Sequence, residues 1–293
     1  MFFLQPTIVS LVIEGRVVRL LVTKGRSVLS WAVVPFNPAL VRAGVITRPQ
    51  DMADIIRQAT ERVRFSGRLA ATFPGVGVVS RVMTLPRGVT ADLDTVVNRE
   101  ARRLMSFTPD TMHLFYERIP GKKGPYQIYT LLVPKGPLDS LMETFEALGQ
   151  RPWVVDLKPL ALARACERTN VIVAYGEASN IDVVIVVDGV PVLMRNVLLG
   201  EEADHIERAR TRMVEEIVRS IAFYNDTHRG MPLSASMPVY LAGDLAADGA
   251  ALVDTIAAAV DRQVSLLTPS LSWPEGVPAA PFAANIGLAL RGV

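Results

Sequence analysis

Cysteine and histidine are scarce in this sequence, and this scarcity limits the chemistry it can support. Cys166 is the only cysteine among 293 residues, so an intrachain disulfide and a metal cluster held by several thiolates are excluded. It lies in the apolar stretch LALARACERT, where we predict a buried helix residue rather than a nucleophile. The three histidines, His113, His205 and His228, are far apart, so they do not indicate a metal site, and we expect each at a surface or boundary position.

The sequence also lacks a strong charge imbalance and a long apolar run. Its formal net charge is +2 and its arginines are scattered, so a nucleic-acid partner is not expected. No stretch approaches the about 20 apolar residues that span a bilayer, and the opening MFFLQPTIVSLVIEG lacks the basic leader of a signal peptide. We therefore expect a cytoplasmic protein without direct membrane insertion.

Apolar residues, in contrast, are abundant. Hydrophobic residues make up 50% of the chain and charged residues 20%, which excludes global disorder. The length suffices for one large domain or two modest ones, each with its own core. No Ser/His/Asp grouping and no pair of carboxylates with an obvious mechanism stands out, so the motifs give no sign of an enzyme.

Two regions follow the same plan, in which three short apolar segments separated by turns precede a helix. In the first region we predict strands at 8–13, 17–23 and 28–34 and a helix at about 50–63. In the second we predict strands at 171–175, 181–187 and 191–198 and a helix at about 201–226, with an apolar stripe of Ile206, Met213, Ile217 and Ile221. A βββα unit that occurs twice predicts two related halves facing each other.

A segment of different character, residues 78–135, lies between these regions. GVVSRVMTLP predicts a strand, TADLDTVVNREARRLMSF a helix, and TMHLFYERIP and YQIYTLLVP a hairpin around GKKG. The residues expected to face inward on this helix are Leu93, Val96, Val97, Ala101 and Leu104. This βαββ unit is predicted to be an inserted subdomain.

After the insert the chain returns to a helix, a strand and a further helix. The apolar face of the helix PLDSLMETFEALG contains Leu138, Leu141, Met142, Phe145 and Leu148. Gly149 is expected to end this helix. The strand PWVVDL and a helix starting at Pro159 lead into the second half, and PFAANIGLALRGV predicts a short apolar helix at the end of the chain.

Several phrases, taken together and in order, resemble a known family. They are AATFPGVGVVSRVMTLP, NREARRLMSFTPDTMHLFYERI, LLVPKGPLDSLMETFEALGQRPWVVDLKPLALARAC, EEIVRSIAFYNDTHRG and AANIGLALRG. This series resembles the PilM family of type IV pilus assembly proteins, which are actin-like relatives of the division protein FtsA. The resemblance implies an α/β, actin-like (ribonuclease H-like) fold with duplicated βββαβα halves and a βαββ insert. The first half would be 1–77 and 136–169, the insert 78–135 and the second half 170–293.

Actin-like folds bind ATP between their halves, and the resemblance implies where each part of that site would lie. In the family, the first phosphate loop has an aspartate and a glycine where this chain has Val12 and Glu14. The second loop has an acidic residue just before its turn, a place that is held here by Ala174 or Tyr175, and the family pattern of aspartate, apolar residue and glycine aligns with Ala174, Tyr175 and Gly176. The other loop positions are Gly15, Arg16, Glu177, Ser179 and Asn180.

Two further family signatures are altered in this chain. The glutamate that often opens the connecting helix is replaced by Lys158, and the adenosine turn of consecutive glycines is reduced to Gly243 followed by Asp244. Mg²⁺ requires oxygen ligands in near-octahedral geometry, and the valine and alanine at the two aspartate positions cannot supply them.

The altered signatures predict a degenerate nucleotide site. Glu14 would add negative charge near the phosphates, an unfavourable charge pair of about 4 kcal/mol at about 4 Å, which Arg16 or Lys158 could partly offset. We expect no catalytic residue, no metal and no cofactor. The alternative is residual binding of ATP with Mg²⁺, with Asp182 or Asp244 holding the metal.

The resemblance also implies a function and a partner. PilM proteins bind a short cytoplasmic leader of the inner-membrane protein PilN, in a groove between the first half and the insert. We therefore expect a non-catalytic scaffold at the inner face of the cell membrane, holding an extended peptide beside a strand. Other pilus assembly proteins are expected as partners, and self-association is left open. The candidate groove residues are Arg81, Met83, Leu85, Arg99, Arg102 and Arg103.

Two alternatives remain from other functional classes. A working ATPase or sugar-kinase-like enzyme would need acidic metal ligands where this chain has Val12 and Ala174. An FtsA-like filament former would be expected to carry an amphipathic, membrane-binding tail after its last helix, which this sequence does not show after Arg291.

Overall fold

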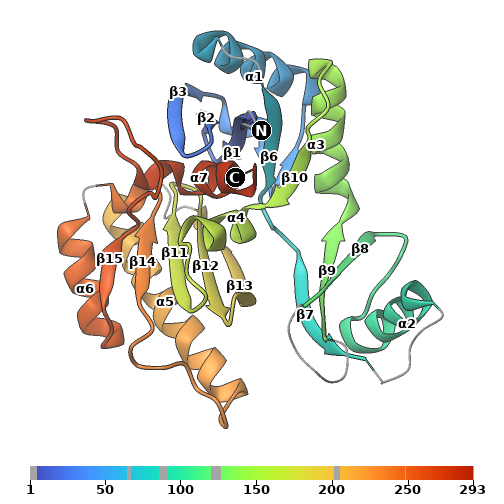
Figure 1. The fold of residues 1–293 in the computed structure, drawn as a ribbon, viewed down its shortest axis with the longest axis vertical. Helices are drawn as coiled ribbons and strands as arrows, with labels where there is room; N and C mark the ends of the chain where they lie inside the picture. The colour runs from blue at the N-terminus through green and yellow to red at the C-terminus, as the bar shows by residue number, and fades with distance from the viewer. Residues whose placement is uncertain are drawn as a thin grey trace.

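Figure 1 shows the fold as two α/β halves, the first at the top and the second at the lower left, with a smaller subdomain at the lower right. The computed structural model describes residues 5–64, 67–85, 92–119, 127–200, 205–247 and 249–292. Within these ranges the strands form two five-stranded sheets, one in each half, and a three-stranded sheet in the subdomain. A two-stranded hairpin completes the first half.

The first half is built on a sheet with the strand order β10-β6-β1-β2-β3. Strands β1, β2 and β3 are antiparallel neighbours, whereas β6 pairs in parallel with β1 and with β10. Its elements are β1 Thr7–Glu14, β2 Val17–Lys24, β3 Ser27–Pro35, η1 Pro38–Leu40, β4 Val41–Arg42, β5 Val45–Ile46, α1 Pro49–Val63, β6 Arg68–Phe73, α3 Lys135–Leu148, β10 Val154–Leu157 and α4 Lys158–Ala165.

The second half repeats this plan with the strand order β13-β12-β11-β14-β15. Three antiparallel strands again precede strands that pair in parallel, so the predicted duplication is confirmed. The elements are β11 Val171–Gly176, β12 Asn180–Val187, β13 Val190–Leu198, α5 Ile206–Thr227, β14 Val239–Ala242, η3 Asp244–Ala246, α6 Ala250–Val260, β15 Val264–Leu266, η4 Ala280–Phe282, α7 Ala283–Ala289 and η5 Leu290–Gly292.

The subdomain lies in sequence between β6 and α3. It contains β7 Val79–Thr84, α2 Leu93–Met105, β8 Met112–Arg118 and β9 Gln127–Pro134, with the sheet order β7-β9-β8. A small core of its own holds α2 against this sheet, and it contains Met83, Leu85, Val97 and Ile128. The predicted GKKG turn lies outside the described residues.

The central strands of each half are apolar on both faces because helices cover both faces. In β1, for example, Val9 and Leu11 belong to the core beneath α1 and α3, whereas Ile8 and Val12 belong to the core shared with α4 and α7. The alternation of side chains along a strand therefore divides each strand between an outer core and a central one.

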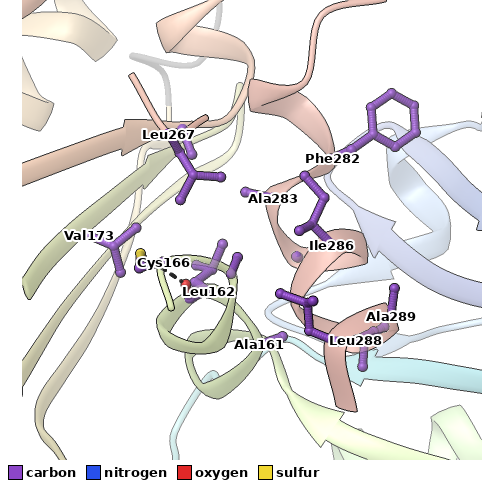
Figure 2. Packing of buried hydrophobic residues seen from close by; sticks show 14 of the residues in the cluster. Ala161, Leu162, Cys166, Val173, Leu267, Phe282, Ala283, Ile286, Leu288 and Ala289 are labelled. Carbon is purple, nitrogen blue, oxygen red and sulfur yellow. Dashed lines mark hydrogen bonds between the residues drawn. The ribbon is translucent and has the colours of Figure 1, made fainter. Parts of the chain in front are cut away.

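The central core joins the two halves, and Figure 2 shows α4 and α7 packed together within it. The two helices approach closely because Gly287 has no side chain: a Cβ there would lie 1.8 Å from the carbonyl oxygen of Ala161. Cys166 lies buried at the end of α4, where its Sγ is 3.3 Å from the Leu162 carbonyl oxygen. Burial raises the pKa of this thiol to about 12, which fits the predicted structural role.

Three residues predicted to face inward are exposed instead. Ile206 and Leu93 are the first residues of α5 and α2, so each lies at the end of its helix rather than on the packed face. Met142 lies on α3, where its exposed side chain borders a groove described below. In each helix, the residues nearer the middle of the predicted stripe are buried.

Across the described ranges, the helices are all too short or too polar to span a bilayer.

Candidate functional site between the halves

The cleft between the halves begins where the β1–β2 turn of the first half meets the β11–β12 turn of the second. Gly15 in the first turn has a φ of +31°, and a Cβ on it would lie 2.5 Å from the Oγ of Ser179 in the second. The two predicted phosphate loops are therefore in contact, which limits the space between them.

A first group of polar side chains crosses the cleft beside these turns. Arg19 of β2 forms an ion pair with Glu14 at the end of β1, and its Nη2 lies 2.7 Å from both carboxylate oxygens of Asp244 in the second half. The Tyr175 hydroxyl of β11 lies 2.6 Å from Glu14 Oε1 and 3.0 Å from the Pro281 carbonyl oxygen. Two carboxylates from opposite halves thus share one arginine.

A second group is centred on Lys158, the first residue of α4. Its Nζ lies 2.5 Å from Glu177 Oε1 and 2.7 Å from Asp182 Oδ2, and all three side chains are buried. Asn180 and Asn196 donate to the two oxygens of Asp182, at 3.0 and 2.7 Å. Lys158 also lies over the ring of Tyr175, with Nζ 5.1 Å from the ring centroid, which brings the two groups side by side.

Burial and mutual charge shift the protonation equilibria of these groups. Burial, reinforced by Glu14, raises the pKa of Glu177 to about 8, although Lys158 acts in the opposite direction. Burial would lower the pKa of Lys158, but Asp182 and Glu177 outweigh it and raise that pKa. Burial together with Glu14 holds the pKa of Tyr175 well above its usual value. Lys158 and Arg19 are therefore permanent cations inside the cleft.

The third predicted turn packs directly onto the second loop. Gly243 follows β14 with a φ of +88°, and a Cβ there would lie 2.2 Å from the Gly176 carbonyl oxygen. Its N–H donates to the Ala280 carbonyl oxygen at 2.8 Å. A residue with a side chain would be strained at this position and would also clash with Gly176.

The structure brings most of the predicted nucleotide positions together. Glu14, Gly15, Lys158, Gly176, Glu177, Ser179, Asn180, Gly243 and Asp244 all lie at this junction of the halves. Arg16 lines the cavity beside it, and Val12 is buried in the central core.

One alternative at this site is decided and one expectation is wrong. Of the two candidates for the acidic place, Ala174 packs in the outer core beneath α5, and Tyr175 faces the cleft, because successive side chains of a strand point to opposite faces. Glu14 does not present an uncompensated negative charge, because Arg19 neutralises it. Arg19 was not predicted, although its position in the apolar strand VVRLLVTK was a signal, since a charge in a buried strand requires a partner.

A cavity of about 210 Å³ adjoins the loops on the side of the first half. Its lining includes Gly15, Arg16, Lys158 and Asn180. This volume is below the about 300–1,000 Å³ of typical small-molecule sites. In addition, each of the four carboxylates of the cleft is engaged by Arg19 or Lys158, and the described residues contain no cluster of three or more acidic, histidine or cysteine side chains placed to hold a metal ion. These residues do not fit Mg·ATP.

A larger groove lies between the first half and the subdomain. It has a volume of about 460 Å³ and contains apolar side chains of β9, such as Leu131 and Val133, facing Leu138 and Met142 of α3. The groove is also lined by a continuous stretch of β8, Phe115–Glu117, and by a continuous stretch of β10, Val155–Leu157. Both strands are the edges of their sheets, so the groove is bordered by strand edges as well as by apolar faces.

The six predicted groove residues lie elsewhere. Met83 and Leu85 are only 2% and 1% exposed and belong to the core of the subdomain, so that part of the prediction is wrong. Arg81 donates from Nη1 to the Leu104 carbonyl oxygen at 2.8 Å, and the remaining three, Arg99, Arg102 and Arg103, are exposed on α2. The groove is formed by β8, β9, α3 and β10 instead, which come together only in the folded chain.

Two halves with the same strand order, joined by packed helices and separated by a cleft at their hairpin turns, define an actin-like ATPase fold with two ribonuclease H-like halves. A solved structure titled "PilM-PilN type IV pilus biogenesis complex" aligns over 98% of both chains, with a TM-score of 0.77 and 20% sequence identity. The model of the family described as type IV pilus assembly protein PilM matches residues 16–206. The chain belongs to this family.

Two other solved structures share the fold at lower similarity. The ethanolamine utilization protein EutJ from Carboxydothermus hydrogenoformans has a TM-score of 0.57 and 13% identity, over 97% of this chain and 89% of that chain. The cytoplasmic domain of EpsL, an inner-membrane component of the type II secretion system of Vibrio cholerae, has a TM-score of 0.54 and 11% identity, over 98% of this chain and 94% of that one. No curated protein matches the sequence.

Proposed function

We propose that this chain is a non-catalytic scaffold of a type IV pilus assembly platform, which binds the N-terminal cytoplasmic segment of a PilN-like inner-membrane protein. Binding would recruit the chain to the inner face of the cell membrane. Membership of the PilM family and the fold shared with the PilM–PilN complex support this assignment. The observation that carries it is the groove between the first half and the subdomain.

This groove has the properties that recognition of an extended peptide requires. Its volume of about 460 Å³ lies within the range of ligand sites. The edge strands β8 and β10 offer backbone N–H and C=O groups for strand addition, and the apolar side chains between them offer pockets for alternate side chains of a peptide. Phe115 and Met142, both exposed, lie where an incoming peptide would cover them.

The cleft between the halves supports a non-catalytic role. An ATPase of this fold needs acidic groups able to hold Mg²⁺ through water, whereas here Lys158 and Arg19 engage the carboxylates. These side-chain contacts connect the two halves directly. The altered loops thus favour a protein whose halves are held together by its own residues.

The groove is tested by titrating a synthetic peptide with the sequence of the N-terminal cytoplasmic segment of the PilN-like protein from the same organism. We expect Met142→Asp to weaken its binding by about tenfold or more, equivalent to about 1.4 kcal/mol, because a carboxylate would be desolvated in an apolar groove. The matched control is Met231→Asp, at an exposed methionine of the second half.

A second pair of variants separates loss of contact from charge effects. Phe115→Ala should weaken binding, and Phe223→Ala, which removes an exposed phenylalanine from α5, should not. Thermal unfolding of all four variants verifies that they fold. Absence of binding to the unmodified chain, or equal effects within each pair, would overturn the proposal.

A further inference from the structure

A second cavity, of about 350 Å³, continues the groove toward the second half. The two share Glu117, Tyr129, Leu160 and Arg291 as lining residues, so a peptide in the groove could extend into it. Its far wall contains Gly189 of the β12–β13 turn and Pro191 of β13, both in the second half. The cavity therefore lies at a junction of the subdomain with both halves.

The chemistry of this second cavity differs from that of the apolar groove. Arg164 and Arg291 converge on one oxygen of a buried carboxylate, each with its Nη1 2.9 Å from Asp156 Oδ2. The other oxygen of Asp156 accepts from the N–H of Leu157 at 3.0 Å. Two guanidinium groups thus share a single carboxylate, which leaves one positive charge uncompensated.

A third arginine adds to this excess. Arg168 lines the same cavity, is exposed, and has no ion-pair partner in the part of the chain that the structure describes. Arg118 also lines it, and the acidic lining residue is Glu117. Even without Arg118, the three arginines Arg164, Arg168 and Arg291 outnumber the carboxylates of Asp156 and Glu117, so the field in this cavity attracts anions.

We propose that Arg164, Arg168 and Arg291 form an anion subsite at the end of the groove, and that the bound partner segment places a carboxylate there. The inference rests on the proposed function, because the occupant is the same peptide. A carboxylate matches the planar, forked donors of arginine, and a peptide seated in the groove delivers it to the cavity without a separate binding event. The subsite would fix the direction and register of the peptide.

The test uses Arg168, because it is exposed and has no ion-pair partner among the described residues. Arg168→Gln is compared with Arg229→Gln, at an exposed arginine after α5, in titrations with the native peptide at low and high salt. The same titrations are made with a peptide in which each Asp and Glu is replaced by Asn and Gln. Arg168→Gln should weaken binding of the native peptide about two- to fivefold at low salt, as for an exposed ion pair, and less at high salt.

The double comparison decides the inference. The neutralised peptide should bind the unmodified chain about two- to fivefold more weakly than the native peptide does. Arg168→Gln should not weaken the binding of the neutralised peptide any further. If the native peptide binds and Met142→Asp weakens it, but Arg168→Gln and the neutralised peptide have no effect, the anion subsite is refuted while the proposed function stands. If the native segment contains no acidic residue and still binds in the groove, the anion subsite is likewise refuted and the proposed function stands.

Inorganic phosphate is titrated separately to distinguish the two sources of an anion. If phosphate binds the unmodified chain, Arg168→Gln abolishes that binding, and the neutralised peptide binds as well as the native one, the cavity serves a free phosphate and the peptide assignment is overturned. If no peptide binds the unmodified chain, both the proposed function and this inference fail.

Discussion

Lys158 connects the two halves of the molecule through a single buried side chain. It lies at the first residue of α4 with two carboxylates of the second half within 2.7 Å. In an interior of low dielectric, such a pair is costly to desolvate and strongly destabilising when only one partner is removed. The cation thus lies between two acidic side chains of the second half and links them to the first half.

The neighbouring Glu177 predicts a pH dependence of stability. Its pKa is about 8 in the folded chain against a usual value of 4.5, so between these values the folded state holds a proton that the unfolded state has released. The stabilisation is fully present below pH 4.5 and is lost as the pH rises through 8. The free energy of unfolding is measured with urea at about pH 5 and about pH 8 for the wild type and for Glu177→Gln. Between these pH values, the wild type should lose more than about 1 kcal/mol of unfolding free energy relative to the variant.

The control for this measurement is Glu61→Gln, at an exposed glutamate of α1. Its difference in unfolding free energy from the wild type should stay constant over the same range. Parallel pH curves for the wild type and Glu177→Gln would show that Glu177 titrates normally.

At the scale of elements, the crossing of α4 and α7 determines how the halves are joined. Helix α7 comes from the end of the chain but packs against β1 and β2 of the first sheet as well as against α4. Asn285 of α7 donates to the Ser10 carbonyl oxygen at 2.9 Å. Figure 2 shows Leu288 of α7 next to Ala161 of α4 at this crossing. A close approach of backbones here depends on small residues.

Gly287→Ala tests the crossing. Its new Cβ would lie 1.8 Å from the Ala161 carbonyl oxygen, and since this neighbour is backbone, the helices would have to separate. We expect a loss of about 1–3 kcal/mol in unfolding free energy, measured by urea denaturation. Gly230→Ala is the matched control, because a Cβ there meets nothing within 4 Å. Equal stability of the two variants would contradict the assigned role of Gly287.

The elements themselves were largely predictable from local patterns. Each predicted meander strand lies within a residue or two of its observed bounds, because alternation and turn residues act over short distances. The errors lie at helix ends such as Ile206 and at Met142, whose exposure depends on a groove formed by other elements. Helical periodicity defines a face, but it does not define what covers that face.

At the scale of the whole molecule, the cleft between the halves leaves little space for a nucleotide. The loops at Gly15 and Ser179 touch, and the adjoining cavity is about 210 Å³. Calorimetric titration with ATP, with and without Mg²⁺, should therefore give no detectable heat, while the partner peptide gives heat in the same preparation. Tight binding that depends on Mg²⁺ would contradict this expectation and would require the cleft carboxylates to exchange Lys158 and Arg19 for a metal.

The sequence by itself determined the duplicated strand plan and the insert, because periodicity and residue identity are local properties. Only the tertiary structure decided which charges meet. Arg19 and Asp244 are 225 positions apart in the chain, and the groove combines strands of the insert with α3 and β10. The side chain of β11 that reaches the cleft is Tyr175 rather than Ala174, because the facing direction depends on strand register and on the packing of two sheets. Contacts between distant segments follow from burial of the whole core, which no local pattern specifies.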